Sequence, residues 1–218
     1  MEKLKIFLFI ILVSVINLSC AKKDTNNSVI NEKSLDQQVL EAYSEGKKSL
    51  EEGDVLFAAK KFNEAEILFP QSEWAPKSAL MAAYSYYIQD YYSDAIAELL
   101  RFKIVYASDK NLDYANYLLA ICYFEQIVDE KKDLQSIMNA KKSFEYIITN
   151  FPNTEYATDS KFKIDLINDI LASKEMYVGR YYFDKKKWIA SINRFLNVVN
   201  YYNENFDSCD VEKYLDLA

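Results

Sequence analysis

The sequence predicts an all-α protein, a solenoid of antiparallel helix pairs with about four repeats plus the start of a fifth. Two stretches repeat one spacing of 4, 3 and 5 residues: Ala58, Phe62, Ala65, Pro70 and Ala140, Phe144, Ile147, Pro152. A small residue with apolar residues at i+4 and i+7 forms one face of a helix, and the proline ends that helix. With only 3 glycines and 3 prolines, the chain lacks the turn residues of an all-β protein. The pattern is typical of the second helix of a tetratricopeptide (TPR) unit.

Residues 1–19 have the pattern of a signal peptide. Two lysines precede an apolar run from Ile6 to Ile16, which is shorter than the ~20 residues that a membrane-spanning helix needs. Ser19 and Cys20 follow, and a small residue before a cysteine resembles the lipobox of bacterial lipoproteins. We therefore expect a lipid anchor on Cys20 and a polar tether over residues 20–35. An ordinary secretory signal with an incidental cysteine is the alternative.

Residues 36–218 are predicted to form the repeat domain, beginning with helix pairs at about residues 36–71 and 74–107. Gly46 lies 12 residues before Ala58, at the position where the two helices of a TPR unit touch most closely. The same separation joins further pairs of small residues in later repeats: Ala83 with Ala95, and Gly179 with Ser191. An unrelated helical bundle, which is the alternative, would not require this coincidence.

The later repeats are predicted with more variation in length. The third begins with a helix at about residues 112–128, and its small residues Ala120 and Ala140 are 20 apart, which indicates about eight extra residues between its two helices. The polar run 129–133 is predicted to be the loop there. A single long helix is predicted over about residues 154–183, because nothing breaks the helical pattern there. Trp188 opens the next helix, and the segment from Asp207 begins a fifth repeat.

Composition excludes several classes of function. The chain contains no histidine, the commonest general base and transition-metal ligand. Its formal net charge of −7 argues against binding to bulk nucleic acid. We therefore expect no catalytic residues, no metal and no cofactor. A periplasmic enzyme that carries TPR appendages, such as a peptidoglycan hydrolase, is a disfavoured alternative.

With these features in place, the chain resembles the BamD family, lipoproteins of the machine that assembles β-barrel proteins in the outer membrane. The resemblance covers about residues 39–202. It is carried by five local strings in order: Phe69-Pro70-Gln71-Ser72 with Trp74-Ala75, Ala83-Tyr84-Ser85-Tyr86-Tyr87, Asn111-Leu112-Asp113-Tyr114 with Tyr117, Phe151-Pro152-Asn153-Thr154 with Tyr156, and Tyr181-Tyr182 with Trp188 and Asn193-Arg194. The family pattern has prolines before the third string, and this chain lacks them.

Tyrosine is frequent, at 18 residues, and it concentrates in repeats two and three. An AT-rich genome is one explanation, and an aromatic recognition surface on the concave face of the solenoid is the other. The resemblance implies that the N-terminal repeats bind the aromatic-rich C-terminal signal of unfolded outer-membrane proteins. The candidate groove residues are Tyr84, Tyr87, Tyr91, Tyr114 and Tyr117. From their helical phase, Tyr86 and Tyr92 are expected in the core, and about half of these seven tyrosines are expected to be buried.

The resemblance also implies a docking surface in the fourth repeat. Arg194 stands where the family keeps arginine, and contact is implied there with the periplasmic domain next to the barrel of a BamA-like insertase. Asn193 and Trp188 are its candidate neighbours. Arginine suits a bidentate pair with a carboxylate. The alternative is that Arg194 is a solvated helix residue.

Cys122 is expected in the core, and a disulfide to Cys209 is the less favoured possibility.

The resemblance thus implies an assembly factor held on the periplasmic face of the outer membrane by the lipid on Cys20. Its expected partners are unfolded outer-membrane β-barrel proteins, the BamA-like insertase and other lipoproteins of the assembly machine, with no nucleic acid. Another TPR lipoprotein, such as a pilotin for secretin or pilus assembly, is the alternative function.

Overall fold

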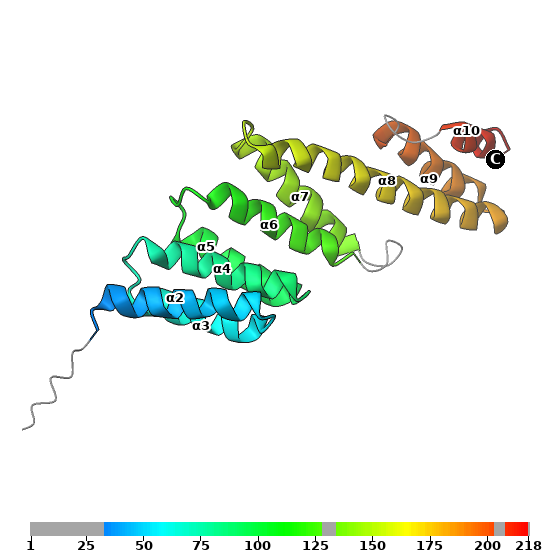
Figure 1. Ribbon diagram of the computed structural model, residues 1–218. Coiled ribbons are helices and arrows are strands. Elements are labelled where there is room, and N and C mark those ends of the chain that lie inside the picture. The colour runs from blue at the N-terminus through cyan, green and yellow to red at the C-terminus, as the bar shows by residue number, and fades with distance from the viewer. Residues whose placement is uncertain (1–32, 128–133, 203–207, 218) are drawn as a thin grey trace, which may run out of the picture. The chain divides into compact units, whose positions relative to one another are not determined.

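The described residues of the computed structural model, 33–127, 134–202 and 208–217, form α-helices joined by turns, with no β-strand among them. The helices, labelled in Figure 1, are α2 (Leu35–Glu51), α3 (Val55–Leu68), α4 (Trp74–Ile88), α5 (Tyr92–Val105), α6 (Leu112–Glu125), α7 (Leu134–Asn150), α8 (Glu155–Asp184), α9 (Trp188–Tyr201) and α10 (Ser208–Leu217). The all-α prediction is confirmed. The predicted signal peptide, Cys20, most of the tether and the loop at 129–133 lie outside the described residues.

Successive helices pack against each other as hairpins along the chain (Figure 1). The pairs α2–α3, α4–α5, α6–α7 and α8–α9 correspond to the four predicted repeats, and α10 packs on α9 as the start of the fifth. The first helices of successive pairs also contact each other, α2 with α4, α4 with α6, and α6 with α8. These first helices therefore share one face of the stack.

Side-chain caps set where several helices begin. Ser34 Oγ accepts a hydrogen bond from the N–H of Gln37 at 3.3 Å, and Gln37 Oε1 accepts one from the N–H of Ser34 at 3.2 Å. This capping box satisfies two N–H groups that α2 itself leaves unpaired. Thr154 Oγ1 caps α8 in the same way, accepting from the N–H of Ala157 at 3.2 Å. The 30 residues of α8 match the long helix predicted over 154–183.

None of the helices in the described ranges combines the length and the apolar character that crossing a bilayer requires.

The residues that share the repeat spacing form the contact inside each helix pair. Ala58, Phe62 and Ala65 are each 0% exposed. The corresponding residues of the other three pairs are buried as well: Ala95, Leu99 and Phe102; Ala140, Phe144 and Ile147; Ser191, Phe195 and Val198. The prediction that this face is core is confirmed, and it explains why a helix pair recurs wherever the spacing recurs.

Gly46 and Gly179 lie where an aromatic ring presses against the backbone of the first helix of its pair. A Cβ atom on Gly46 would lie 2.9 Å from the ring of Phe62, and one on Gly179 would lie 2.5 Å from the ring of Phe195. Contacts below 3.0 Å are essentially absent between real Cβ atoms and their neighbours. Ser191 Oγ also donates a hydrogen bond to the carbonyl of Gly179 at 2.9 Å, so the two helices touch at their small residues. Glycine at these two positions is therefore a requirement of packing.

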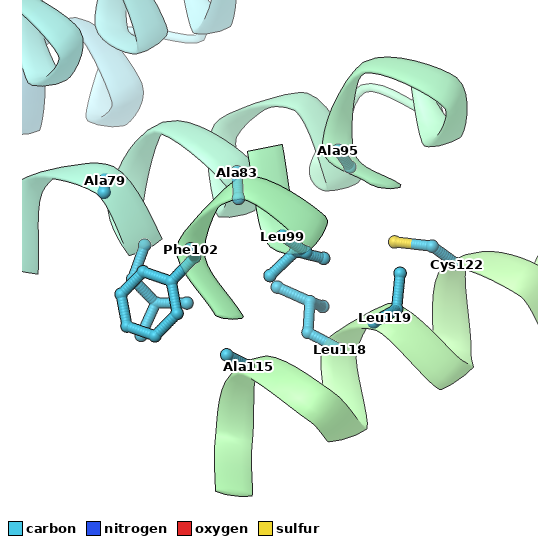
Figure 2. Packing of buried hydrophobic residues seen from close by; sticks show 10 residues of the cluster. Ala79, Ala83, Ala95, Leu99, Phe102, Ala115, Leu118, Leu119 and Cys122 are labelled. Atoms are coloured by element: carbon cyan, nitrogen blue, oxygen red, sulfur yellow. The ribbon is translucent and has the colours of Figure 1, made fainter. Parts of the chain in front are cut away.

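The second repeat and the first helix of the third share one apolar core (Figure 2). It combines small and large side chains, and its members include Ala79, Ala83, Ala95, Leu99, Phe102, Ala115, Leu118, Leu119 and Cys122. Burial raises the pKa of the Cys122 thiol to about 12, so this residue stays neutral and packs as a small apolar side chain, as predicted. The alternative of a bond to Cys209 falls on a side chain outside the described residues.

Candidate functional site

A cavity of about 400 Å³ lies between the first helices of the first three repeats. Its lining comes from α2, α4, α6 and the residue that precedes α6: Tyr43, Lys77, Leu80, Met81, Tyr84, Asn111 and Tyr114. Four of these residues, from Lys77 to Tyr84, stand at i, i+3, i+4 and i+7 and thus occupy one face of α4. The volume falls within the range of ligand-binding sites, and most of the lining is aromatic or aliphatic. The cavity is therefore a candidate site for an apolar or aromatic group.

Aromatic rings continue from this cavity along the face shared by the first helices. Ring centroids lie 5.0–6.2 Å apart in four pairs: Tyr43–Trp74, Tyr84–Tyr87, Tyr114–Tyr156 and Tyr117–Tyr156. These residues come from α2, α4, α6 and α8. Aromatic pairs at such distances stabilise a structure by about 0.5–1.5 kcal/mol each beyond their burial. The rings are consequently held in place by the fold, before any ligand arrives.

The environment of this aromatic face favours neutral tyrosines. Burial raises the pKa of Tyr114 to about 12, and burial also raises the pKa of Tyr43. The pKa of Tyr117 is raised by burial and by the hydrogen bond that its hydroxyl donates to Asp159 at 2.6 Å. Because the charged form of each is disfavoured, these side chains present apolar rings with an O–H donor at physiological pH.

The five tyrosines predicted for the groove fall into different settings. Tyr84 and Tyr114 line the cavity. Tyr87 lies beside Tyr84, with ring centroids 6.2 Å apart, and Tyr117 is further along α6 against the ring of an α8 tyrosine. Tyr91 precedes α5 in the turn after α4, is 42% exposed and does not line the cavity. The structure thus brings two of the five together at one site.

The expectation that about half of the tyrosines in repeats two and three would be buried is wrong. Of the seven, Tyr91 is exposed and the other six are half-buried. Tyr86 and Tyr92, which we expected in the core, pack against its edge and keep part of their surface in solvent. The hydroxyl of Tyr92 donates to Asp90 at 2.7 Å. The physical reason is that a phenol needs a polar partner or water for its O–H, which keeps the ring at the boundary of an apolar core.

Sequence reasoning did not assign the other five lining residues to the site, among them Tyr43 and Lys77. Tyr43 lies four residues after the buried Val39 and three before the buried Gly46, so it borders the packed face of α2. Lys77 lies seven residues before Tyr84, on the same face of α4. Helical spacing from a residue already singled out could have found Lys77. Tyr43 could not be assigned in this way, because it reaches the cavity only through the packing of α2 against α4.

Arg194, the candidate docking residue, forms an ion pair inside the chain. Its Nη1 donates to both carboxylate oxygens of Glu175 on α8, at 3.1 Å each. Asn197 also donates to Glu175, at 3.0 Å. The Arg194 side chain is nevertheless 41% exposed, and only Nη1 has an acceptor among the described residues. The pair fixes the guanidinium on the surface and leaves its other N–H groups able to bind a partner.

The exposed face of α9 beside Arg194 carries two large apolar side chains as well as Asn193. Ile189, Asn193 and Leu196 stand at i, i+4 and i+7 and are all exposed, Ile189 to 79%. Trp188, at the start of the helix, is 42% exposed and packs its ring against Phe183 at 5.2 Å. The predicted residues Trp188 and Asn193 are therefore accessible. Ile189 and Leu196 are additional candidates that the spacing from Asn193 could have found.

The helix pairs, their shared small-residue contacts and the aromatic cavity on the first helices define a TPR-like helical-repeat protein. The chain belongs to a family of outer membrane lipoproteins, YfiO, whose family model matches residues 35–215. This membership associates the chain with the outer membrane.

Individual relatives agree with the family. A protein of Caulobacter vibrioides is 39% identical over 87% of this chain, and one of Rickettsia prowazekii is 34% identical over 100% of it. A relative in Neisseria gonorrhoeae is 29% identical over 77% of this chain. All three are named outer membrane protein assembly factor BamD. The match spans 61% of the Caulobacter protein, 86% of the Rickettsia protein and 66% of the Neisseria protein.

Proposed function

We propose that this chain is an outer-membrane protein assembly factor that acts by binding and has no catalytic chemistry of its own. It is anchored on the periplasmic face of the outer membrane through a lipid on Cys20. Its N-terminal repeats bind unfolded β-barrel proteins, and its fourth repeat docks on a BamA-like insertase beside other lipoproteins of the assembly machine. The observation that carries the proposal is the aromatic cavity on the first helices of repeats one to three, in a chain whose relatives are named for outer-membrane assembly.

The chemistry of the cavity suits an extended segment of an unfolded β-barrel protein. Such segments alternate apolar and polar side chains, and aromatic residues mark their membrane-interface ends. Rings held in place at 5–6 Å spacing lose little conformational entropy when a second aromatic ring inserts among them. The family match also favours this role over the pilotin alternative, since the relatives carry the assembly-factor name.

Replacement of Tyr84 by alanine is expected to weaken peptide binding about 30-fold, as for an aromatic hot spot worth about 2 kcal/mol. The probe is a fluorescent peptide with the sequence of the last strand of a β-barrel outer-membrane protein, titrated by anisotropy. Tyr84→Phe keeps the ring and should bind almost as tightly as the unmodified chain. Tyr201→Ala removes a tyrosine that is 74% exposed on α9 and serves as the matched control. Equal affinity of the Tyr84→Ala and Tyr201→Ala variants for the peptide would contradict the proposal that the peptide binds in the aromatic cavity.

Replacement of Arg194 by glutamate is expected to reduce recovery of the insertase at least about tenfold. The new carboxylate would repel the carboxylate of the insertase that we expect Arg194 to bind. The measurement is purification of the lipoprotein from gently solubilised outer membrane, followed by mass spectrometry of the bound proteins. Glu175→Gln is the essential control. It weakens the internal ion pair and leaves Arg194 in place, so it should retain the insertase. If both variants lose the insertase, docking depends on the local structure that the Arg194–Glu175 ion pair maintains, and a direct contact of Arg194 with the insertase is not supported.

A further inference from the structure

The turns that join the two helices of the first, second and fourth pairs share one conformation. In each turn, the second residue after the first helix has a left-handed backbone: Gly53 (φ 84°), Asp90 (φ 60°) and Lys186 (φ 56°). The next N–H then donates to the carbonyl five residues back, at 2.9–3.0 Å: Asp54 to Ser49, Tyr91 to Tyr86, and Lys187 to Tyr182. This is the Schellman arrangement, which ends many helices and favours glycine at the left-handed position.

The α8–α9 turn (residues 185–187, Figure 1) has lysine at two positions that local structure disfavours. A left-handed backbone is rare for residues other than glycine, asparagine and aspartate, so Lys186 is in a conformation that its side chain opposes. Lys187 directly precedes α9, makes no side-chain cap, and places its charge at the positive end of that helix. The turn of the first pair has favoured residues at both positions, Gly53 and the capping Asp54. Local folding therefore does not account for the two lysines, and their charge is the property that remains.

The α8–α9 turn is strongly basic within an acidic chain. Residues 180–187 contain one arginine, three lysines and one aspartate, whereas the formal net charge of the whole chain is −7. The corresponding stretch of the first pair, residues 51–54, carries three carboxylates and no cation. Within the part of the chain that the structure describes, none of the ammonium groups of Lys185, Lys186 and Lys187 forms an ion pair with a carboxylate. Positive charge is thus concentrated at this turn and is not neutralised there.

Exposed aromatic rings accompany these lysines. Lys185 Nζ lies 5.9 Å from the centroid of the Tyr181 ring, and Lys187 Nζ lies 6.0 Å from that of Tyr182. Such contacts hold an ammonium group in place without neutralising its charge. Tyr181 is 55% exposed, and Trp188 at the start of α9 is exposed as well. Lysine, tryptophan and tyrosine are the residues with which proteins meet the interface of a bilayer.

We propose that the α8–α9 turn contacts the anionic surface of a phospholipid bilayer, with its three lysines at the lipid phosphates and the rings of Tyr181 and Trp188 at the interface. The charges are complementary, since each lysine near an anionic leaflet adds to the attraction. The chain belongs to a family of outer membrane lipoproteins, so a bilayer is at hand. An acidic protein segment would satisfy the lysines but would leave the exposed rings without a role.

This contact is a second attachment besides the proposed lipid anchor, and it holds the fourth repeat against the membrane. A lipid anchor alone fixes the end of a polar tether and leaves the orientation of the repeats free. The inference goes beyond the proposed function, because it depends on neither peptide binding nor docking on an insertase.

The test follows the fluorescence of Trp188 in the full chain, with Trp74 replaced by phenylalanine, after reconstitution into vesicles whose lipids are brominated near the top of their acyl chains. Bromine quenches tryptophan at close range, so quenching relative to the same vesicles without bromine reports contact of the turn with the bilayer. Vesicles of phosphatidylethanolamine and phosphatidylglycerol should quench at least about twice as strongly as vesicles of phosphatidylcholine, because the lysines hold the turn on an anionic surface. High salt should reduce this difference, because it screens the attraction.

A matched variant gives the α8–α9 turn the residues of the first turn, Lys186→Gly with Lys187→Asp. It should lose the additional quenching in anionic vesicles and yet raise the midpoint of thermal unfolding of the C-terminal repeat, since both new residues suit the local structure. The control is the triple variant Lys47→Gln, Lys60→Gln and Lys142→Gln, which makes the same change in net charge at exposed lysines of α2, α3 and α7. It should keep the additional quenching. A lower midpoint in the turn variant would contradict the premise that these lysines oppose the local structure.

Equal quenching of the unmodified chain in the two kinds of vesicle would overturn the inference, because the turn would then not respond to lipid charge. Flotation of the vesicles separates this inference from the proposed function. A chain that floats with both kinds of vesicle but is quenched in neither is held by its anchor alone, whereas a chain that does not float has neither the anchor nor the contact. If lipid charge has no effect and the turn variant loses the insertase from purified outer membrane, the turn binds an acidic protein segment instead of a bilayer.

Discussion

Replacement of Arg101 by leucine is expected to lower the free energy of unfolding by about 3 kcal/mol, because it leaves the Glu66 carboxylate buried without its charge partner. Glu66 is 7% exposed, and its two oxygens accept hydrogen bonds from Arg101 Nη1 and Nη2 at 2.7 Å each. Tyr106 also donates to Glu66, at 2.6 Å, and would be the one remaining partner in the variant. We place the effect at the lower end for buried pairs because the Arg101 side chain is 40% exposed, so water can reach part of the vacated space.

The two partners of this ion pair are expected to differ in effect. Glu66→Gln leaves Arg101 half in solvent and still paired with Glu98 at 2.8 Å, so it should lower the free energy of unfolding by only about 1 kcal/mol. The double variant, with leucine at both positions, should recover much of the loss of Arg101→Leu, since no buried charge remains. Urea unfolding followed by the fluorescence of Trp74, with Trp188 replaced by phenylalanine, would report on repeats one and two. Equal losses for the two single variants would contradict the assignment of Glu66 as the buried partner.

The Glu66–Arg101 pair also illustrates what the sequence alone could not predict. Glu66 follows Ala65 directly, and its partner is 35 residues away on the next repeat. Nothing local distinguishes it from the solvated glutamates around it, because its burial arises only when α5 packs near α3. Core positions such as Phe62 were predictable because they follow from the helical spacing inside one repeat.

The candidate site was predictable to a smaller extent than the fold. Tyr84 and Tyr114 could be singled out because they lie in the tyrosine-rich repeats, and both line the cavity. The sequence could not predict which of the tyrosines line the cavity, because this depends on which rings face the space between successive first helices. The same limit applies to Arg194, whose pair with Glu175 joins α8 to α9. Helical periodicity predicts which residues of one helix share a face. Contacts between residues of two different helices depend on how those helices pack, which the periodicity does not predict.

Replacement of Phe195 by alanine is expected to have the largest effect on the C-terminal repeat, lowering its free energy of unfolding by about 3–5 kcal/mol. Phe195 is 0% exposed, and its ring lies against Gly179 on one side and stacks with Tyr214 of α10 at 5.2 Å. The variant loses the burial of the ring and leaves a cavity that the rigid backbone at Gly179 cannot fill. Because neighbouring repeats in a solenoid stabilise each other locally, the loss should appear in α8 to α10 before it appears elsewhere. Trp188 fluorescence in a chain with Trp74→Phe would detect it.

The packing of Gly179 against Phe195 can be tested by exchanging it for the pair that the second repeat uses. There, Ala83 stands at the glycine position and Leu99 at the phenylalanine position, within one core (Figure 2). Gly179→Ala alone should lower the free energy of unfolding, because its Cβ would lie 2.5 Å from the ring of Phe195. We expect this clash to cost about 1–3 kcal/mol, which exceeds the ~1 kcal/mol that alanine gains over glycine inside a helix. In a Phe195→Leu background the same substitution should be neutral or stabilising. An equal loss in both backgrounds would mean that glycine is required there for a reason other than the ring, and the common spacing of the repeats would then not explain its position.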